Sequence, residues 1–257
     1  MISFIILIFA GALAGLMAGL LGLGGATVMV PLYLYYFKLE NTIPEFQQFH
    51  MAVGCSLAVI FVSSIVASIH NYRLKLIDYA LVKKILPGLI VGIFVGTILS
   101  RWMDGLILKK LFSLFLMSLA IKLFISKNHS PHRIGPISNY LFHGIAILVG
   151  ILNALFGIAG GIILVPFFIF MGLMTQKAVA TSIFCAIPIS FIANAVLTLS
   201  FHQLLIDWHV VFYTGITSTL FIPLGSKIGQ HTSSNWLKRI FTVFLLLIAM
   251  DMAINSF

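Results

Sequence analysis

Apolar residues fill long runs of this chain, and short polar stretches separate one run from the next. Strands of a membrane barrel would alternate apolar and polar positions over about ten residues, whereas these runs are continuous. A helix needs about 20 apolar residues to cross the hydrocarbon core of a bilayer, and the long runs come close to that length. The pattern therefore predicts an all-α polytopic membrane protein with eight long helices, over residues 2–21, 47–69, 79–99, 107–126, 138–156, 178–199, 208–228 and 236–255.

Two glycine-rich segments break this pattern at equivalent places. GLGGATVMVP occupies residues 22–31, and GIAGGIILVP follows 135 residues later at 157–166. Gly costs about 1 kcal/mol relative to Ala in a helix interior, and Pro about 3, so a continuous helix is disfavoured there. Each break precedes a short arm, 25–37 or 160–172, which is about 20 Å long as a helix. Paired breaks are typical of the binding site in inverted-repeat transporters, although glycines alone also suit close helix packing.

The repeat extends well beyond the two breaks. Gly54-Cys55-Ser56 matches Ala180-Thr181-Ser182 at an offset of 126 residues. Ile77-Asp78-Tyr79 matches Ile206-Asp207-Trp208 at an offset of 129, and LKKLF at 108–112 matches LKRIF at 237–241 at the same offset. We interpret the chain as a duplication within one membrane domain. Its parts are an N-terminal repeat at 1–126, a polar linker at 127–137 and a C-terminal repeat at 138–257.

The distribution of Lys and Arg indicates how the halves are oriented. If each short arm turns back to form a hairpin, four of the 15 basic residues share a side with the chain start, 38–46, 100–110, 200–207 and the C-terminus. The other side then carries eleven, whereas a simple kink at each break would divide them seven against eight. Because basic loops stay in the cytoplasm, the hairpin is favoured. It gives each half an odd number of crossings, so we expect inverted repeats with both termini extracytoplasmic.

Composition and charge support a membrane protein and exclude a soluble one. Hydrophobic residues make up 61% of the chain and charged residues 8%, against about 25% charged in soluble domains. The net charge of +9 suits loops that face cytoplasm and anionic lipid, so no nucleic acid partner is expected. The first 21 residues lack the basic start of a signal peptide and are interpreted as a structural helix. Cys55 and Cys185 lie in apolar segments, most simply as small core residues.

The tips of the two hairpins are the predicted binding site. Each arm would begin inside the membrane, so its helix N-terminus would present partial positive charge and free N–H groups to an anion. Glycine would let the ligand approach the backbone closely and would permit a positive φ. Inversion would bring the tips together near the midplane, where Gly22, Gly24, Gly25 and Ala26 would face Gly157, Gly160 and Gly161.

A polar stripe follows each hairpin. Ser56, Ser64 and Ser68 recur 126 residues later as Ser182, Ser190 and Asn194, and this spacing puts each trio on one helix face. These groups suit either an oxyanion or hydrogen bonds between helices. Asn153, one turn before the second break, is an additional donor whose counterpart is Ala18. The candidate substrate contacts outside the glycines and Ala26 are thus Thr27, Cys55, Ser56, Asn153, Thr181, Ser182 and Asn194.

The remaining polar residues have simpler explanations. His70, His143 and His202 lie near predicted helix ends and suit the membrane interface. Asp78 and Asp207 precede helices as N-caps. Asp251 and its counterpart Lys122 lie within a turn or two of helix ends, where snorkelling accounts for them. We find no nucleophile–base pair, Walker motif or metal cluster, and therefore expect neither an enzyme nor a cofactor.

The paired GxGGxxxxxP-type motifs, the duplicated four-helix pattern and the chain length resemble the TauE/SafE sulfite-exporter family of bacterial membrane permeases. The resemblance covers essentially the whole chain, although Ala26 and Ala159 stand where a third glycine is common. It implies a protein of the bacterial inner membrane that handles sulfite, sulfoacetate or a related small anion.

The leading hypothesis is a secondary transporter for a small sulfur-containing or carboxylate anion, working by alternating access. An anion channel is the alternative, because no intramembrane carboxylate obviously couples transport to protons. A membrane scaffold or assembly factor that retains the transporter fold is a third class. The expected partners are the anion and the lipid bilayer, and a homodimer is left open.

Overall fold

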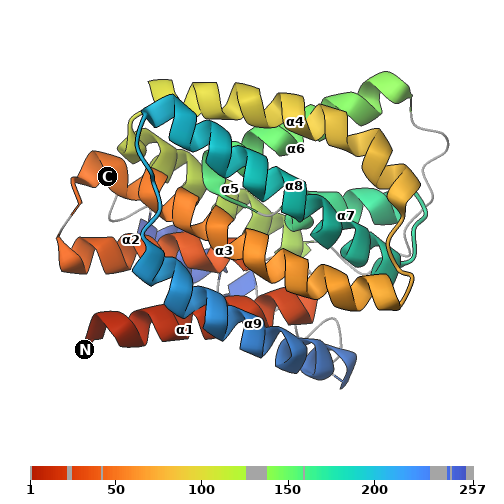
Figure 1. Cartoon of the computed structure of the whole chain (residues 1–257), viewed down its shortest axis with the longest axis horizontal. Coiled ribbons are helices and arrows are strands. Elements are labelled where there is room, and N and C mark those ends of the chain that lie inside the picture. Colours follow the sequence, from red (N-terminus) through yellow and green to blue (C-terminus); the bar gives the residue numbers. More distant parts are fainter. Residues whose placement is uncertain are drawn as a thin grey trace.

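The chain is a bundle of helices in a computed structural model that describes residues 2–21, 25–41, 43–125, 138–158, 160–231, 242–243 and 245–252 (Figure 1). These residues form helices and short loops, with no β-strand among them, which confirms the all-α prediction. Residues 242–243 and 245–252 are helical too, within the predicted helix 236–255. The labelled helices are α1 (Ile2–Leu21), α2 (Ala26–Glu40), α3 (Glu45–Arg73), α4 (Tyr79–Trp102), α5 (Gly105–Ile125), α6 (Asn139–Phe156), α7 (Gly161–Phe170), α8 (Thr175–Phe201) and α9 (Trp208–His231).

Helix lengths follow the apolar runs closely. In the part described, α3, α4, α6 and α8 are long and apolar enough to cross a membrane by length and composition. The apolar stretches Phe4–Leu20 of α1 and Gly161–Phe170 of α7 are shorter. The second arm is thus a helix of only 10 residues, whereas the first has 15. Each arm is a helix shorter than the one that precedes it, as predicted from the breaks.

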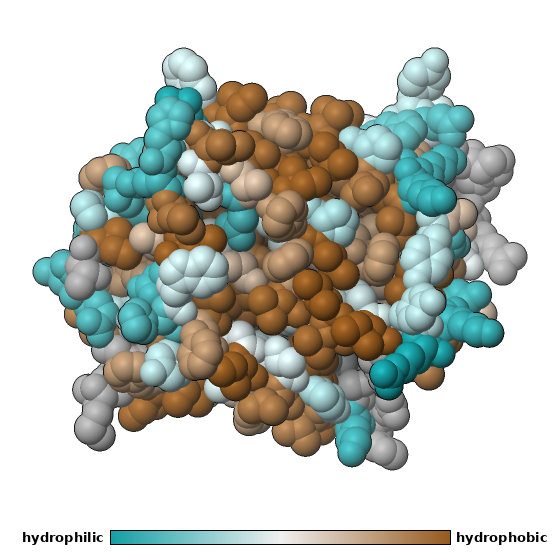
Figure 2. All heavy atoms as spheres, in the orientation of Figure 1, coloured by the Kyte–Doolittle hydropathy of each residue, from teal (hydrophilic) through white to brown (hydrophobic). Residues whose placement is uncertain are grey.

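On the face shown in Figure 2, an apolar band lies between two polar ends. On α9 every fourth residue is a large apolar side chain about half or more exposed: Phe212, Ile216, Leu220, Leu224 and Ile228. A soluble protein rarely exposes a continuous apolar surface of this extent. One face of such a helix therefore suits lipid while the opposite face packs inside the bundle.

The loops gather at two ends that differ in charge. One end, which we call the acidic end, carries Glu40, Glu45, Asp104 and Asp207. Surface clefts there bring the end of α2 beside the starts of α3 and α5, and the end of α4 beside that of α8. The opposite, basic end has the loops from α3 to α4 and from α7 to α8 (Figure 1), with Arg73, Lys75, Lys83, Lys84 and Lys177 in or beside them.

The first helix and its arm form a hairpin. Phe4 of α1 packs edge to face on Tyr213 of α9, 5.1 Å between ring centroids, and α9 begins directly after the acidic-end loop. Lys38, near the end of α2, lines a cleft at the same end. Since α1 starts and α2 finishes at the acidic end, the chain turns back between them, as the hairpin prediction requires.

Glycines set two close helix pairs that are equivalent under the repeat. A Cβ on Gly225 of α9 would lie 3.0 Å from the Cα atom of Leu16 in α1. A Cβ on Gly96 of α4 would lie 2.9 Å from the Cα atom of Ile151 in α6. Gly225 corresponds to Gly96 at an offset of 129 residues, and Ile151 corresponds to Leu16 at an offset of 135, so the two contacts are equivalent. Small residues of this kind let membrane helices approach closely.

The central helices α3 and α8 cross in opposite directions. His50 near the start of α3 lies 4.8 Å from Phe201 at the end of α8, while Phe61 lies 5.6 Å from Phe191, as measured between ring centroids. These helices are equivalent under the 126-residue offset, so antiparallel packing is what an inverted duplication requires.

Candidate functional site

The first helix break places Gly25 tightly against α1. Gly25 is the N-cap of α2 and has φ −75°, so a positive φ is not what requires glycine here. A Cβ at this position would lie 2.5 Å from the Cβ atom of Ala14 and 2.7 Å from its carbonyl oxygen. The glycine is therefore needed for close approach. Gly22 and Gly24 lie outside the described residues, as does the side chain of Ala26.

The second break does use left-handed glycines. Gly157 ends α6 with φ 64°, and its N–H donates to the carbonyl of Asn153 at 2.9 Å. Gly160 is the N-cap of α7 with φ 66°. Neither α2 nor α7 has a side-chain hydrogen bond capping its N-terminus or an acidic residue in its first turn. Both arms therefore begin with uncapped N–H groups inside the bundle, which suits an anion.

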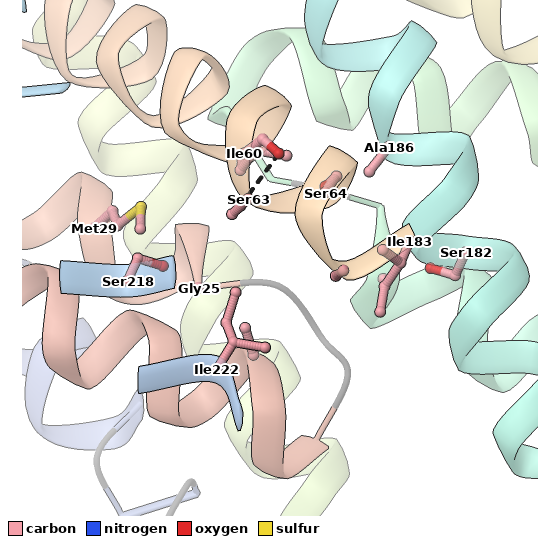
Figure 3. Close-up of a pocket in the computed structure, with 13 residues that line it drawn as sticks. Gly25, Met29, Ile60, Ser63, Ser64, Ser182, Ile183, Ala186, Ser218 and Ile222 are labelled. Carbon is pink, nitrogen blue, oxygen red and sulfur yellow. Dashed lines mark hydrogen bonds between the residues drawn. The ribbon is translucent and has the colours of Figure 1, made fainter. Parts of the chain in front are cut away.

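A cavity of about 50 Å³ lies where the two arms begin. In Figure 3, Ser182 and Ile183 of α8 lie across from Gly25 and Ser218, with Ser63 and Ser64 of α3 between them. Among the described residues no charged side chain is part of its wall, so hydroxyls and the uncapped helix starts supply its polarity. The cavity is lined by Ala18, Gly25, Met29, Ile60, Ser63, Ser64, Ala67, Gly161, Ser182, Ile183, Ala186, Ser218 and Ile222.

Among the described residues, several buried polar atoms have no hydrogen-bond partner. They are the hydroxyls of Thr27, Ser68 and Ser182 and both amide atoms of Asn153. Each of these residues is at most 5% exposed. Buried polar groups in folded proteins are nearly always paired, and an unpaired one costs about 1–3 kcal/mol. Ser182 lines the cavity, so its hydroxyl is available to a ligand or water there.

Ser56 lies outside the cavity wall and forms a hydrogen bond with the second break. Its hydroxyl donates to the carbonyl of Val53 at 2.8 Å and to that of Gly157 at 3.2 Å. In this structure the hydroxyl hydrogen of Ser56 is already shared between two backbone carbonyls, so direct contact between Ser56 and an anion remains a prediction.

Thr181 and Cys55 make equivalent hydrogen bonds to the backbone just before α4 and α9. Thr181 accepts a hydrogen bond of 3.1 Å from the backbone N–H of Asp78, just before α4. Cys55 accepts one of 3.2 Å from the N–H of Asp207, just before α9. These two bonds are equivalent under the repeat, and neither residue lines the cavity. Both aspartates also cap their helices, Asp78 through Leu81 N–H and Asp207 through His209 N–H, as predicted.

Asn194 joins α8 to α3. With its amide in the orientation that satisfies both atoms, its nitrogen donates to the Gly54 carbonyl at 3.3 Å and its oxygen accepts from the Ala58 N–H at 3.1 Å. The structure therefore brings Gly25, Gly161 and Ser182 together at the cavity and places Gly157, Gly160, Asn153 and Thr27 at the breaks around it. Ser56 bonds to Gly157 at the second break without lining the cavity, whereas Cys55, Thr181 and Asn194 bond elsewhere.

Two hydroxyls of the cavity wall were absent from the predicted site. Ser63 and Ser218 correspond under the repeat to Ile189 and Leu89, so the duplication gave no signal for them. Ser64 belonged to the predicted stripe. In the described part of the chain, no group of three His, Cys, Asp or Glu residues could hold a metal ion.

Comparison with known proteins decides the family. The model of the sulfite exporter TauE/SafE family matches residues 7–252. The chain belongs to this family. As a TauE/SafE member it is a multi-pass membrane protein of a transporter family, in agreement with its apolar helices.

Relatives of this TauE/SafE chain carry the same general description. A Probable membrane transporter protein from Haemophilus influenzae is 28% identical, with 98% of this chain and 99% of that protein covered. One from Methanocaldococcus jannaschii is 31% identical, with 74% and 70% covered. The Probable membrane transporter protein YunE of Bacillus subtilis is 26% identical, with 96% of each covered. No solved structure matches the chain.

Proposed function

We propose that this chain is a secondary transporter for a small anion, which binds in the cavity between the two helix breaks. The observation that carries the proposal is the buried hydroxyl of Ser182, which has no partner and lies in a cavity wall shared with Gly25 and Gly161 at the uncapped starts of α2 and α7.

The chemistry of the wall favours an anion over a cation. No carboxylate is among the described residues that line the cavity, and hydroxyls together with helix N-termini are hydrogen-bond donors with partial positive charge. The basic end also raises the local concentration of anions. A neutral wall binds a small anion without holding it too tightly for release.

The cavity volume favours a substrate of sulfite size. One water needs about 10–15 Å³ of such space, so about 50 Å³ accommodates roughly three to five water-sized groups. Sulfite or a short carboxylate fits this space. A sulfonate with a longer carbon chain would extend along the apolar side chains of Met29 and Ile222.

The position of the cavity and the distribution of charge support one orientation of the protein in the membrane. Ser64 and Ala67 lie in the second half of α3, which runs from the acidic end to the basic end. The basic end faces the cytoplasm under the positive-inside rule, which places both termini outside. The described conformation then has its cavity on the cytoplasmic side of an inner membrane, which corresponds to one of the two states of an alternating-access cycle.

Counterflow in proteoliposomes tests the proposal. Purified protein is reconstituted with unlabelled sulfite inside, and uptake of labelled sulfite, sulfonates and short carboxylates is measured together with membrane conductance. Exchange without net conductance is expected of the transporter. Conductance would identify an anion channel. If no anion gives either flux or conductance, the protein is a membrane scaffold and not a transporter.

A further inference from the structure

The open cavity lies beside the axis that relates the two repeats. Ile60 and Ala186 are equivalent under the 126-residue offset, and they pack against each other in the cavity wall. An operation that exchanges the repeats exchanges these two residues, so it passes between them. The rest of the cavity lies to one side, and its equivalent must lie on the other.

The equivalent positions are closed by packing. Ser63, Ser64 and Ile222 of the open cavity correspond to Ile189, Ser190 and Ile93, and Met29 corresponds to Leu164. None of these four equivalents is more than 1% exposed, whereas Ser63 and Ile222 are only partly buried. Ser190 lies in the second half of α8, which runs to the acidic end, so the closed region is nearer that end.

The closed region keeps the polar pattern of the open cavity. Gly25 corresponds to Gly160, and the hydroxyls of Ser64 and Ser182 correspond to those of Ser190 and Ser56. Ser190 donates to the Ala186 carbonyl of its own helix at 2.6 Å, and Ser56 to the Val53 carbonyl at 2.8 Å. Ser56 also donates to the Gly157 carbonyl at 3.2 Å. A hydroxyl that donates only to backbone carbonyls can exchange that bond for a ligand when space opens.

Asn153 provides an independent sign of a ligand in this region. Its side chain is 1% exposed, and neither its amide oxygen nor its amide nitrogen has a hydrogen-bond partner. The nitrogen lies 3.0 Å from where a Cβ on Gly160 would be, so the amide is directed at the start of α7. Its equivalent in the open cavity is Ala18. A buried amide with no partner requires an explanation, which a ligand in another conformation supplies.

We propose that Asn153, Ser56, Ser190 and the start of α7 form a second anion chamber, closed in this structure, which opens to the acidic end when the first chamber closes. The proposal rests on the transport function and adds to it a binding site with its own chemistry. In the first chamber the anion meets hydroxyls and the start of α2. In the second it also receives a hydrogen bond from the Asn153 amide, and Ile60 and Ala186 separate the two chambers.

Thiol labelling of two equivalent serines tests the second chamber. Ser64→Cys and Ser190→Cys are near-isosteric, and the wild type with its two buried cysteines gives the background. The reconstituted protein is treated with a small charged thiol reagent on one side and a quencher on the other. Ser64→Cys is expected to react from the basic end at rest. A state populated at about 10% or less becomes the major one under an anion gradient, so labelling of Ser190→Cys from the acidic end should rise roughly tenfold.

Two labelling results would overturn the second chamber without touching the transport function. One is a Ser190→Cys protein that exchanges anion yet never reacts from the acidic end. The other is a Ser190→Cys protein that reacts at rest from the basic end as fast as Ser64→Cys does. Absence of exchange by the wild type would instead remove the transport proposal, and the second chamber with it.

Asn153→Ala gives a second measurement, because it makes the second tip match Ala18 at the first. The half-saturating anion concentration should rise about 10- to 150-fold for anion added at the acidic end, the range for losing a hydrogen bond to a charged ligand. For anion added at the basic end it should stay nearly constant. An equal change on both sides, or no change on either, would show that Asn153 does not bind the anion in a second chamber.

Discussion

At the residue scale, replacing Ser182 distinguishes an effect on anion binding from an effect on folding stability, because its hydroxyl has no hydrogen-bond partner among the described residues. Ser182→Ala should raise the half-saturating anion concentration for exchange about 10- to 150-fold, because it removes a donor to a charged ligand. The free energy of unfolding should stay constant or rise, since the hydroxyl has no partner to lose. Exchange kinetics and thermal unfolding in detergent measure the two effects.

Ser118→Ala is the matched control for this variant. Ser118 is exposed and bonds only to the Phe115 carbonyl of its own helix at 2.8 Å. It should therefore change neither quantity. A Ser182→Ala protein with wild-type kinetics and lower stability would show that the hydroxyl serves the fold and not the anion.

Thr181 should behave in the opposite way. Thr181→Val keeps the shape of the side chain but leaves the backbone N–H of Asp78 without its acceptor, which should cost about 1–3 kcal/mol of unfolding free energy. The half-saturating anion concentration should not change. Thr219→Val is the control, because the Thr219 hydroxyl bonds only within its own helix. Weaker anion binding with unchanged stability would return Thr181 to the site.

Ser182 and Ser56 also show what the sequence could predict at this scale. The repeat identifies both as equivalent polar positions, and the prediction included both. Their environments differ, because Ser182 packs at the cavity without a partner whereas Ser56 packs against Val53 and Gly157, whose carbonyls accept from it. Which member of an equivalent pair faces the cavity depends on that packing, which has no local signature in the sequence. Ser63 and Ser218 were not foreseen, because their repeat equivalents Ile189 and Leu89 are apolar.

At the element scale, glycines on facing helices hold α4 against α6. A Cβ on Gly150 would lie 2.9 Å from the Cα atom of Gly92, so Gly150→Ala forces the two helices apart. Overpacking of this kind costs about 1–3 kcal/mol, more than the roughly 1 kcal/mol that alanine gains in helix propensity. We expect a lower thermal midpoint for Gly150→Ala.

Gly144 in the same helix is the matched control. Outside its own helix backbone, no described atom lies within 4 Å of a Cβ added there, so Gly144→Ala should raise the midpoint through propensity alone. Equal midpoints for the two variants would mean that the α4–α6 contact contributes little to stability.

The helix positions could be predicted from the sequence, because a long apolar run in a bilayer has few other structures open to it. The pairing of α4 with α6 could not be predicted. It depends on which glycines face each other, and the repeat alone does not say which helix each glycine contacts.

At the scale of the whole molecule, the two ends differ in charge, and this difference predicts the orientation in the membrane. The hairpin arrangement assigns four basic residues to the acidic end and eleven to the basic end. The structure places the loops before α3, α5 and α9 together at the acidic end, whereas the loops from α3 to α4 and from α7 to α8 lie at the opposite end (Figure 1). Because basic loops remain in the cytoplasm, the acidic end should face outward.

Single cysteines on the two ends test this orientation in intact cells. Gln203→Cys lies in the exposed loop between α8 and α9, and Leu74→Cys lies at the end of α3, where the native side chain is 54% exposed. An impermeant thiol reagent should label Gln203→Cys from outside and Leu74→Cys only after the membrane is permeabilised. The wild type should stay unlabelled, because Cys55 and Cys185 are buried. Labelling of Leu74→Cys alone in intact cells would reverse the orientation, and the open cavity would then face outward.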